Sequence, residues 1–105
     1  MLPKTPGPSP AAPGIRRLHV LFLGTVQGVG FRYTALSIAR CHAVTGWVRN
    51  VPDGRVELVA EGPSGELEAF LADVGEEMAS YISSVERTWE PATGEWNRFT
   101  ITGAF

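Results

Sequence analysis

The chain has 105 residues, 44% of them hydrophobic and 19% charged, with a formal net charge of −2 at pH 7. This length predicts one domain with one core, and the composition excludes a wholly disordered chain. The single cysteine, Cys41, excludes an internal disulfide and a multi-cysteine zinc site. The apolar runs are far shorter than the ~20 residues of a membrane helix, and no secretory signal is visible, so we expect a cytoplasmic protein.

The charges divide unevenly along the chain. Residues 1–55 carry seven basic residues and one acid, whereas residues 56–105 carry two basic residues and ten acids. Every basic residue except Lys4 is arginine, whose guanidinium can bind phosphate or carboxylate through two hydrogen bonds. Two interpretations stay open, a chance segregation of solvated charges and a small-anion site in the first half. The acidic total argues against a large nucleic-acid footprint.

The sequence divides into a tail and a domain. Residues 1–14 contain five of the eight prolines and almost no apolar bulk, which predicts a flexible tail before a domain at 15–105. In the first part of that domain the patterns predict, in chain order, a fully covered central strand at 18–23, a glycine-rich loop at 24–30, a helix at 31–40, a strand at 44–50, a turn at 51–54 and a strand at 55–61.

The second part predicts a helix and two strands. Ser64 is a candidate N-cap for an amphipathic helix that runs to Met78, and strands follow at 82–89 and 99–102. The order βαββαβ plus a short final strand predicts a ferredoxin-like two-layer α+β sandwich, with an antiparallel sheet and two helices on one face. In this topology the first two strands are parallel with one strand between them, so their ends lie ~10 Å apart. A ligand on the glycine-rich loop is then within reach of Asn50.

The glycine-rich loop joins a strand to a helix N-terminus, an arrangement whose converging N–H groups can bind phosphate. It lacks the Gly-Lys-Ser/Thr of a Walker A motif, and Tyr33 stands where a dinucleotide fingerprint needs its third glycine. Spacing alone leaves open both a structural tight turn and an anion cradle.

Two polar residues flank this candidate site. Arg32 lies in the first helical turn, where the helix dipole disfavours a cation by ~0.3–1 kcal/mol, so either an anion binds there or the side chain extends into solvent. Asn50 precedes a Pro-Asp-Gly turn, and on sequence alone a turn-forming role is favoured. Its amide can also donate to one group while it accepts from a water molecule.

Three motifs closely resemble the acylphosphatase family, and the resemblance runs from about Leu18 to Phe105. They are Gly24-Thr25-Val26-Gln27-Gly28-Val29-Gly30-Phe31-Arg32, Gly46-Trp47-Val48-Arg49-Asn50 and Asp53-Gly54-Arg55-Val56-Glu57. The resemblance implies a ferredoxin-like enzyme that hydrolyses the carboxyl–phosphate bond of acyl phosphates without metal or cofactor. It assigns phosphate binding and catalysis to Arg32, the positioning of the attacking water to Asn50, and a phosphate cradle to the backbone amides of Gln27, Gly28, Val29, Gly30, Phe31 and Arg32.

The resemblance also implies the partners of this chain. We expect a monomer that takes a small acyl phosphate as substrate and releases inorganic phosphate, with no nucleic-acid or membrane partner. Two alternatives are a nonenzymatic ferredoxin-like module that binds RNA or a small ligand, and an acylphosphatase-like domain of a larger protein that handles carbamoyl phosphate. An RNA-binding sheet is expected to interleave aromatic and basic residues on its middle strands, whereas Val56, Leu58 and Ala60 are apolar.

Overall fold

The computed structural model describes residues 14–103, so the predicted tail, apart from Gly14, lies outside the described residues. The elements run in the order β1 (Ile15–Gly24), α1 (Phe31–Ala39), β2 (Thr45–Asn50), β3 (Val56–Pro63), α2 (Ser64–Glu77), a short 3-10 helix (Ala79–Tyr81), β4 (Ile82–Pro91) and β5 (Phe99–Ile101). Each predicted element is present with small shifts at its ends. The 3-10 helix was not predicted. None of the helices in this part of the chain is long and apolar enough to span a membrane.

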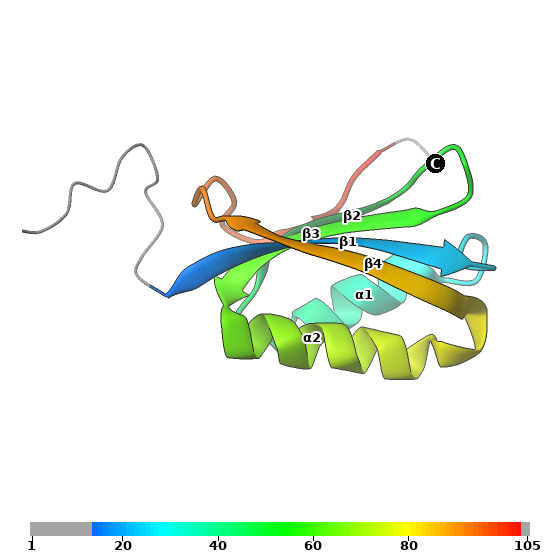
Figure 1. The fold of residues 1–105 in the computed structure, drawn as a ribbon, viewed down its shortest axis with the longest axis horizontal. Helices are drawn as coiled ribbons and strands as arrows, with labels where there is room; N and C mark the ends of the chain where they lie inside the picture. Colours follow the sequence, from blue (N-terminus) through cyan, green and yellow to red (C-terminus); the bar gives the residue numbers. More distant parts are fainter. Residues whose placement is uncertain (1–13, 104–105) are drawn as a thin grey trace, which may run out of the picture.

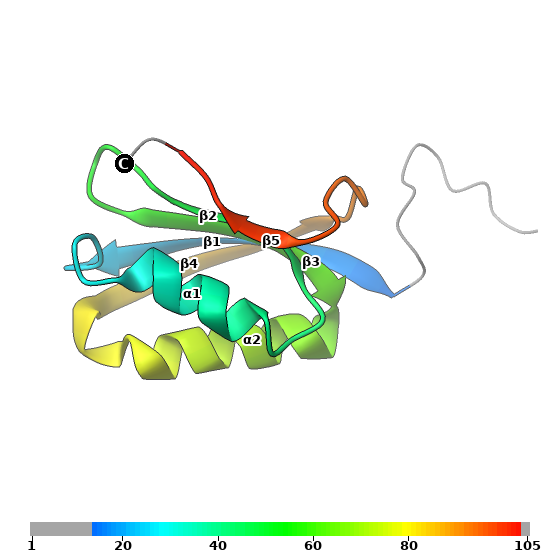
Figure 2. The same cartoon turned by 180° about the vertical axis from the view of Figure 1, so that it is seen from behind.

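The strands form one sheet in the order β4-β1-β3-β2-β5, and both helices cover the same face of it (Figures 1 and 2). Strands β1 and β2 are each antiparallel to β3, which lies between them, so β1 and β2 are parallel to one another. The predicted ferredoxin-like two-layer α+β fold is therefore confirmed. The glycine-rich loop after β1 and the turn between β2 and β3 lie at the same end of the sheet (Figures 1 and 2).

The prediction of an antiparallel sheet is wrong at one edge. Strand β5 pairs with β2 in parallel, with Gly46 opposite Phe99 and Val48 opposite Ile101. Strand β4 is antiparallel to β1. Because the chain reverses direction between β4 and β5, β5 runs parallel to both β1 and β2. The short final strand thereby extends the sheet beyond β2 as a parallel neighbour.

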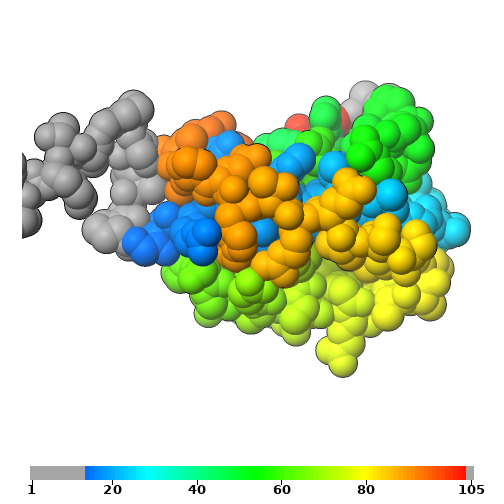
Figure 3. Space-filling view, in the orientation of Figure 1, coloured from blue at the N-terminus to red at the C-terminus, as the bar shows by residue number. Residues whose placement is uncertain are grey.

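The core lies between the sheet and the two helices. Leu18, Val20 and Phe22 of β1 point toward the helices and are buried, whereas the alternate residues His19 and Leu21 are only partly buried. The prediction that β1 is covered on both faces is therefore wrong, because both helices occupy one face. Strand β4 is the opposite edge strand, with a largely exposed sequence that forms much of the near surface in Figure 3.

Helix α2 has the predicted amphipathic face but a different start. Its buried residues are Leu67, Phe70, Leu71 and Val74. Pro63, with φ −59° and ψ 141°, occupies the N-cap position, and Ser64 is the first helical residue rather than the cap. Proline fixes φ near this value and ends β3, so the helix begins directly after it without a side-chain cap.

Candidate active site

The start of the glycine-rich loop is fixed by a close backbone approach. Gly24 has φ +134°, and a Cβ atom at this position would lie 2.3 Å from the carbonyl oxygen of Tyr81. The N–H of the next residue, Thr25, donates a hydrogen bond to that same oxygen at 2.9 Å. Only glycine fits here, and the loop leaves β1 against the segment that precedes β4.

The middle of the loop has a conformation that favours glycine. Gly28 and Gly30 have φ +77° and +80°, and a Cβ atom built on either would meet no atom within 4 Å. These two glycines are therefore required by the backbone conformation and not by crowding, and they border open space. A ligand can approach the backbone closely on this side of the loop.

Gly30 is also the N-cap of α1. The first helical hydrogen bond runs from the N–H of Thr34 to the carbonyl of Gly30 at 3.0 Å, and the first turn contains no acidic residue. The N–H groups of a first helical turn have no partners within the helix, and the helix dipole places partial positive charge there. The ring of Phe31 is buried against Phe22, with 4.8 Å between ring centroids, which anchors this turn to the sheet.

The side chain of Gln27 connects the loop to the turn after β2. Its amide nitrogen donates one hydrogen bond to the carbonyl of Val51 at 2.7 Å and another to the carbonyl of Arg55 at 2.9 Å. Both donor hydrogens are thus used to hold the loop beside the end of β2. The sequence motif implied a role only for the backbone amide of Gln27, since no local pattern shows that its side chain reaches a residue 24 positions away.

Asn50 ends β2 and is only 9% exposed. The following turn is closed by other groups, with the N–H of Val51 bonded to Arg55 and the N–H of Gly54 bonded to Val51. Within residues 14–103 the Asn50 side chain forms no hydrogen bond, and none of its polar atoms is sealed from solvent. An amide at such a buried position usually has a protein partner, so its position fits a group that binds water or a ligand better than one that forms a turn.

Arg32 and Asn50 line one pocket of about 120 Å³, although they come from different elements. The other lining residues are Val26, Gly28, Gly30, Phe31 and Tyr33. A water molecule takes up about 30 Å³ of the liquid, so this volume accommodates a phosphate group with a water beside it. Five of the seven residues assigned to the site from the sequence line this pocket, while Gln27 and Val29 do not.

Two features of this pocket were missed from the sequence. Val26 is fully buried and forms part of its wall, and the ring of Tyr33 is 70% exposed. An apolar residue in a glycine-rich loop and an aromatic residue in a first helical turn give no local signal of a site.

No group of three or more His, Cys, Asp or Glu side chains within 14–103 is placed to hold a metal ion.

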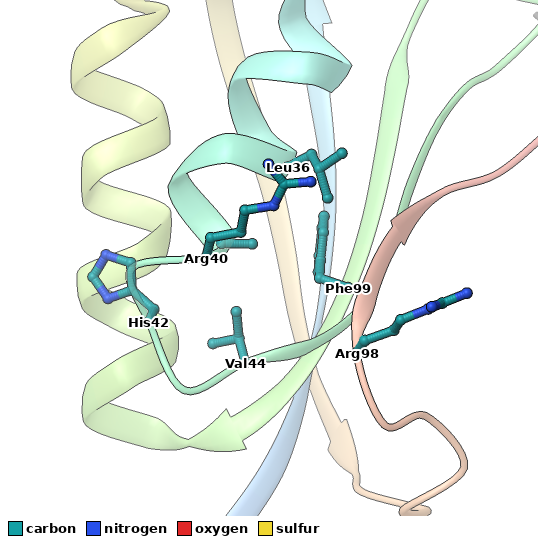
Figure 4. Close-up of a pocket in the computed structure, with 7 residues that line it drawn as sticks. Leu36, Arg40, His42, Val44, Arg98 and Phe99 are labelled. Carbon is teal, nitrogen blue, oxygen red and sulfur yellow. The ribbon is translucent and has the colours of Figure 1, made fainter.

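A larger hollow of about 310 Å³ lies at the other end of α1 and has a different character. Its polar side chains diverge, with Arg40 turned toward Leu36, Arg98 extended outward and His42 directed to α2 (Figure 4). His42 is engaged by Asp73 on α2, with 2.7 Å between Nε2 and Oδ2. Convergent polar groups characterise ligand sites, so the pocket beside the glycine-rich loop is the better candidate.

Comparison with known proteins identifies relatives over nearly the whole described domain. The family model described as Acylphosphatase matches residues 18–101. The acylphosphatase of Methylococcus capsulatus is 43% identical over 89 residues, which cover 83% of this chain and 96% of that protein. The acylphosphatase of Marinobacter nauticus is 44% identical over 90 residues, which cover 84% and 97%.

Solved structures agree with these sequence matches. The crystal structure of acylphosphatase from Bacillus subtilis superimposes with a TM-score of 0.76 at 32% identity and covers 84% of this chain and 99% of that chain. The structure of HypF from T. kodakarensis matches with a TM-score of 0.72 at 31% identity, over 85% of this chain and 12% of that one.

The fold and the site together define a class, the ferredoxin-like α+β sandwiches with a glycine-rich loop at the N-terminus of the first helix. Within that class, the family match and the relatives are specific. The chain belongs to the acylphosphatase family.

Proposed function

We propose that this protein hydrolyses small acyl phosphates to a carboxylate and inorganic phosphate. The observation that carries the proposal is the convergence of Arg32, Asn50 and the loop glycines on one small pocket at a helix N-terminus. The phosphoryl group lies against the N–H groups of residues 27–32, and the guanidinium of Arg32 donates two hydrogen bonds to its oxygens. This arrangement supplies positive charge where charge builds on the equatorial oxygens.

The bond changes balance without a protein nucleophile. A water molecule held by the side-chain amide of Asn50 forms the new O–P bond. The bond between phosphorus and the carboxyl oxygen breaks, and the carboxylate leaves with the electron pair. The proton from the water passes to a phosphate oxygen, because no described side chain in the pocket is an evident general base. The protein acts through positioning and charge stabilisation.

The proposed reaction uses no metal or cofactor, because the amide cradle and Arg32 supply the charge that a metal ion otherwise provides. Hydrolysis of benzoyl phosphate with and without EDTA tests this directly. We expect turnover that EDTA does not change. In water enriched with ¹⁸O we expect the label in the released phosphate and none in benzoate. Loss of turnover with EDTA contradicts metal independence, and labelled benzoate contradicts attack at phosphorus.

The RNA-binding alternative is disfavoured by the open face of the sheet. The side chains that could contact phosphates there are already paired, since Arg17 is 2.8 Å from Glu61 and Arg49 is 2.7 Å from Glu57. Oligonucleotide binding without hydrolysis of acyl phosphate would favour this alternative over the enzyme.

The structure of T. kodakarensis HypF supports the alternative of a domain within a larger protein, because this chain matches only 12% of that HypF chain. Two curated acylphosphatases are about as long as the matched domain, which covers 96% and 97% of them, and this supports acyl phosphate hydrolysis by the domain itself. Turnover of benzoyl phosphate by this chain alone supports that function.

A further inference from the structure

Tyr33 lines the candidate active site and is largely exposed. Its exposed fraction is 70%, against 38% for Tyr81 and 40% for Val85, the other exposed large hydrophobic residues of the described chain. Within residues 14–103 the Tyr33 ring takes part in no hydrogen bond and no aromatic contact. Single exposed apolar residues are common on protein surfaces. The exposure of Tyr33 therefore indicates a function only together with the position of this residue beside the candidate active site.

The position of Tyr33 connects two hollows. It lines the pocket that contains Arg32 and Asn50, and it also lines an adjoining groove of about 450 Å³. The other groove residues are Thr34, Ser37 and Ile38 from α1 and Glu77 from the end of α2. Tyr33 is the one residue that borders both. A molecule that extends out of the small pocket along this groove must therefore pass this residue.

The sizes of the two hollows fit two parts of an acyl phosphate. The small pocket holds little more than a phosphate and a water, so an acyl group of more than a few atoms must lie outside it. The groove has the volume of an ordinary small-molecule site. Tyr33, the residue shared by the two hollows, carries an aromatic ring, which attracts flat apolar groups by stacking and edge contacts.

We propose that Tyr33 binds the acyl group of the substrate, and that the preferred substrates carry an aromatic or extended apolar acyl group rather than a very small one. This inference rests on the proposed function. Tyr33 is a specificity-determining residue here, whereas Arg32 and Asn50 act on the phosphoryl group and the water. The carboxylate of Glu77, which also lines the groove, disfavours acyl groups that carry a second negative charge.

The test compares benzoyl phosphate with acetyl phosphate in the parent, Tyr33→Ala and Tyr33→Phe. We expect the ratio of kcat/KM for benzoyl phosphate to that for acetyl phosphate to fall about three- to tenfold in Tyr33→Ala, the fold-change that corresponds to one aromatic contact. Tyr33→Phe retains the ring and should retain the ratio. Val85→Ala removes an exposed apolar side chain from β4 and is the matched control. An equal change for both substrates, or no change in Tyr33→Ala, overturns the proposal.

A binding measurement separates this inference from the proposed function. Benzoylphosphonate and acetylphosphonate are analogues that cannot be hydrolysed, and calorimetry gives the affinity of each for parent and Tyr33→Ala. We expect the variant to lose affinity for the benzoyl compound selectively. If the parent hydrolyses neither acyl phosphate, the proposed function fails. If the two analogues lose affinity equally or not at all, the role of Tyr33 fails.

Discussion

At position 32 the side chain and the helix dipole oppose one another. A cation in the first turn of α1 is disfavoured by about 0.3–1 kcal/mol, and no acidic residue in that turn offsets it. A phosphate group at this position is attracted both to the partial positive charge of the helix N-terminus and to the guanidinium. In the proposed reaction, a phosphate bound at this position offsets the unfavourable placement of the arginine.

Replacing Arg32 with glutamine tests this assignment. We expect Arg32→Gln to lower kcat for benzoyl phosphate by about 10³-fold, as with arginines that stabilise other phosphoryl transfers, and to weaken inhibition by inorganic phosphate. Arg32→Lys should also lose most activity, because a point charge does not replace two directed hydrogen bonds. Steady-state kinetics on both variants checks this. Activity of Arg32→Gln within tenfold of the parent, with equal phosphate inhibition, contradicts it.

At the scale of elements, the site depends on two segments that meet at one end of the sheet. The β1–α1 loop carries the proposed amide cradle, and the end of β2 carries Asn50. Gln27 of the loop connects the two segments directly, because its side chain donates hydrogen bonds to the carbonyls of Val51 and Arg55 after β2. The relative position of cradle and amide is therefore fixed by a side chain and not by the sheet alone.

We expect Gln27→Ala to lower the free energy of unfolding by about 1–3 kcal/mol, because it removes two hydrogen bonds. It should also lower kcat more than it weakens phosphate inhibition, since the cradle stays with α1 while the alignment with Asn50 loosens. Denaturant unfolding and kinetics on the same preparation measure both effects. The matched control is Glu76→Ala on α2, an exposed residue far along the chain from both segments. A stability loss with unchanged kcat would show that the contact is structural only.

At the scale of the whole molecule, a buried carboxylate holds the crossover from β4 to β5 against the sheet. Glu61 of β3 is 3% exposed and accepts hydrogen bonds from the N–H groups of Thr93 and Gly94 at 2.8 and 2.9 Å, and from Arg17 of β1 at 2.8 Å. Burial alone raises the pKa of Glu61, but these donors outweigh it and hold the pKa below its ordinary value of 4.5. The segment that carries the chain to the far edge of the sheet is thereby fixed by charge as well as by packing.

This shift predicts how stability depends on pH. A folded pKa below the unfolded one gives stability that is present above about pH 4.5 and is lost as the pH falls through the lower, folded pKa. We expect the free energy of unfolding of the parent to fall more steeply than that of Glu61→Gln between about pH 6 and about pH 3. Urea unfolding across this pH range measures the pH dependence of the free energy of unfolding for the parent and for Glu61→Gln. The lowered pKa of Glu57 contributes to the pH dependence of both proteins. Parallel slopes would show that Glu61 does not carry this dependence.

The sequence predicted most of the fold because its signals are local. Alternation in β3 placed Val56, Leu58 and Ala60 on one face, and all three are buried. The predicted antiparallel direction of β5 was wrong. The chain reverses after β4 and β5 then pairs with β2, and both features are set by the arrangement of the whole sheet. For the site, Arg32 and Asn50 could be named from motifs. The contacts of Gln27 and the exposure of Tyr33 depend on residues distant in sequence, so no spacing could show them.

In the proposed reaction the phosphate cradle binds the phosphoryl group and Asn50 positions the water, and one variant tests this division of tasks. Asn50→Ala removes the amide that has no described protein partner and leaves the loop and Arg32 in place. The measurement is kcat for benzoyl phosphate alongside inhibition by inorganic phosphate, on protein shown to be folded by its melting temperature. We predict that kcat falls by about 10²-fold or more while phosphate inhibition is retained. Normal kcat with a lowered melting temperature would contradict the account and return Asn50 to a structural role in the turn.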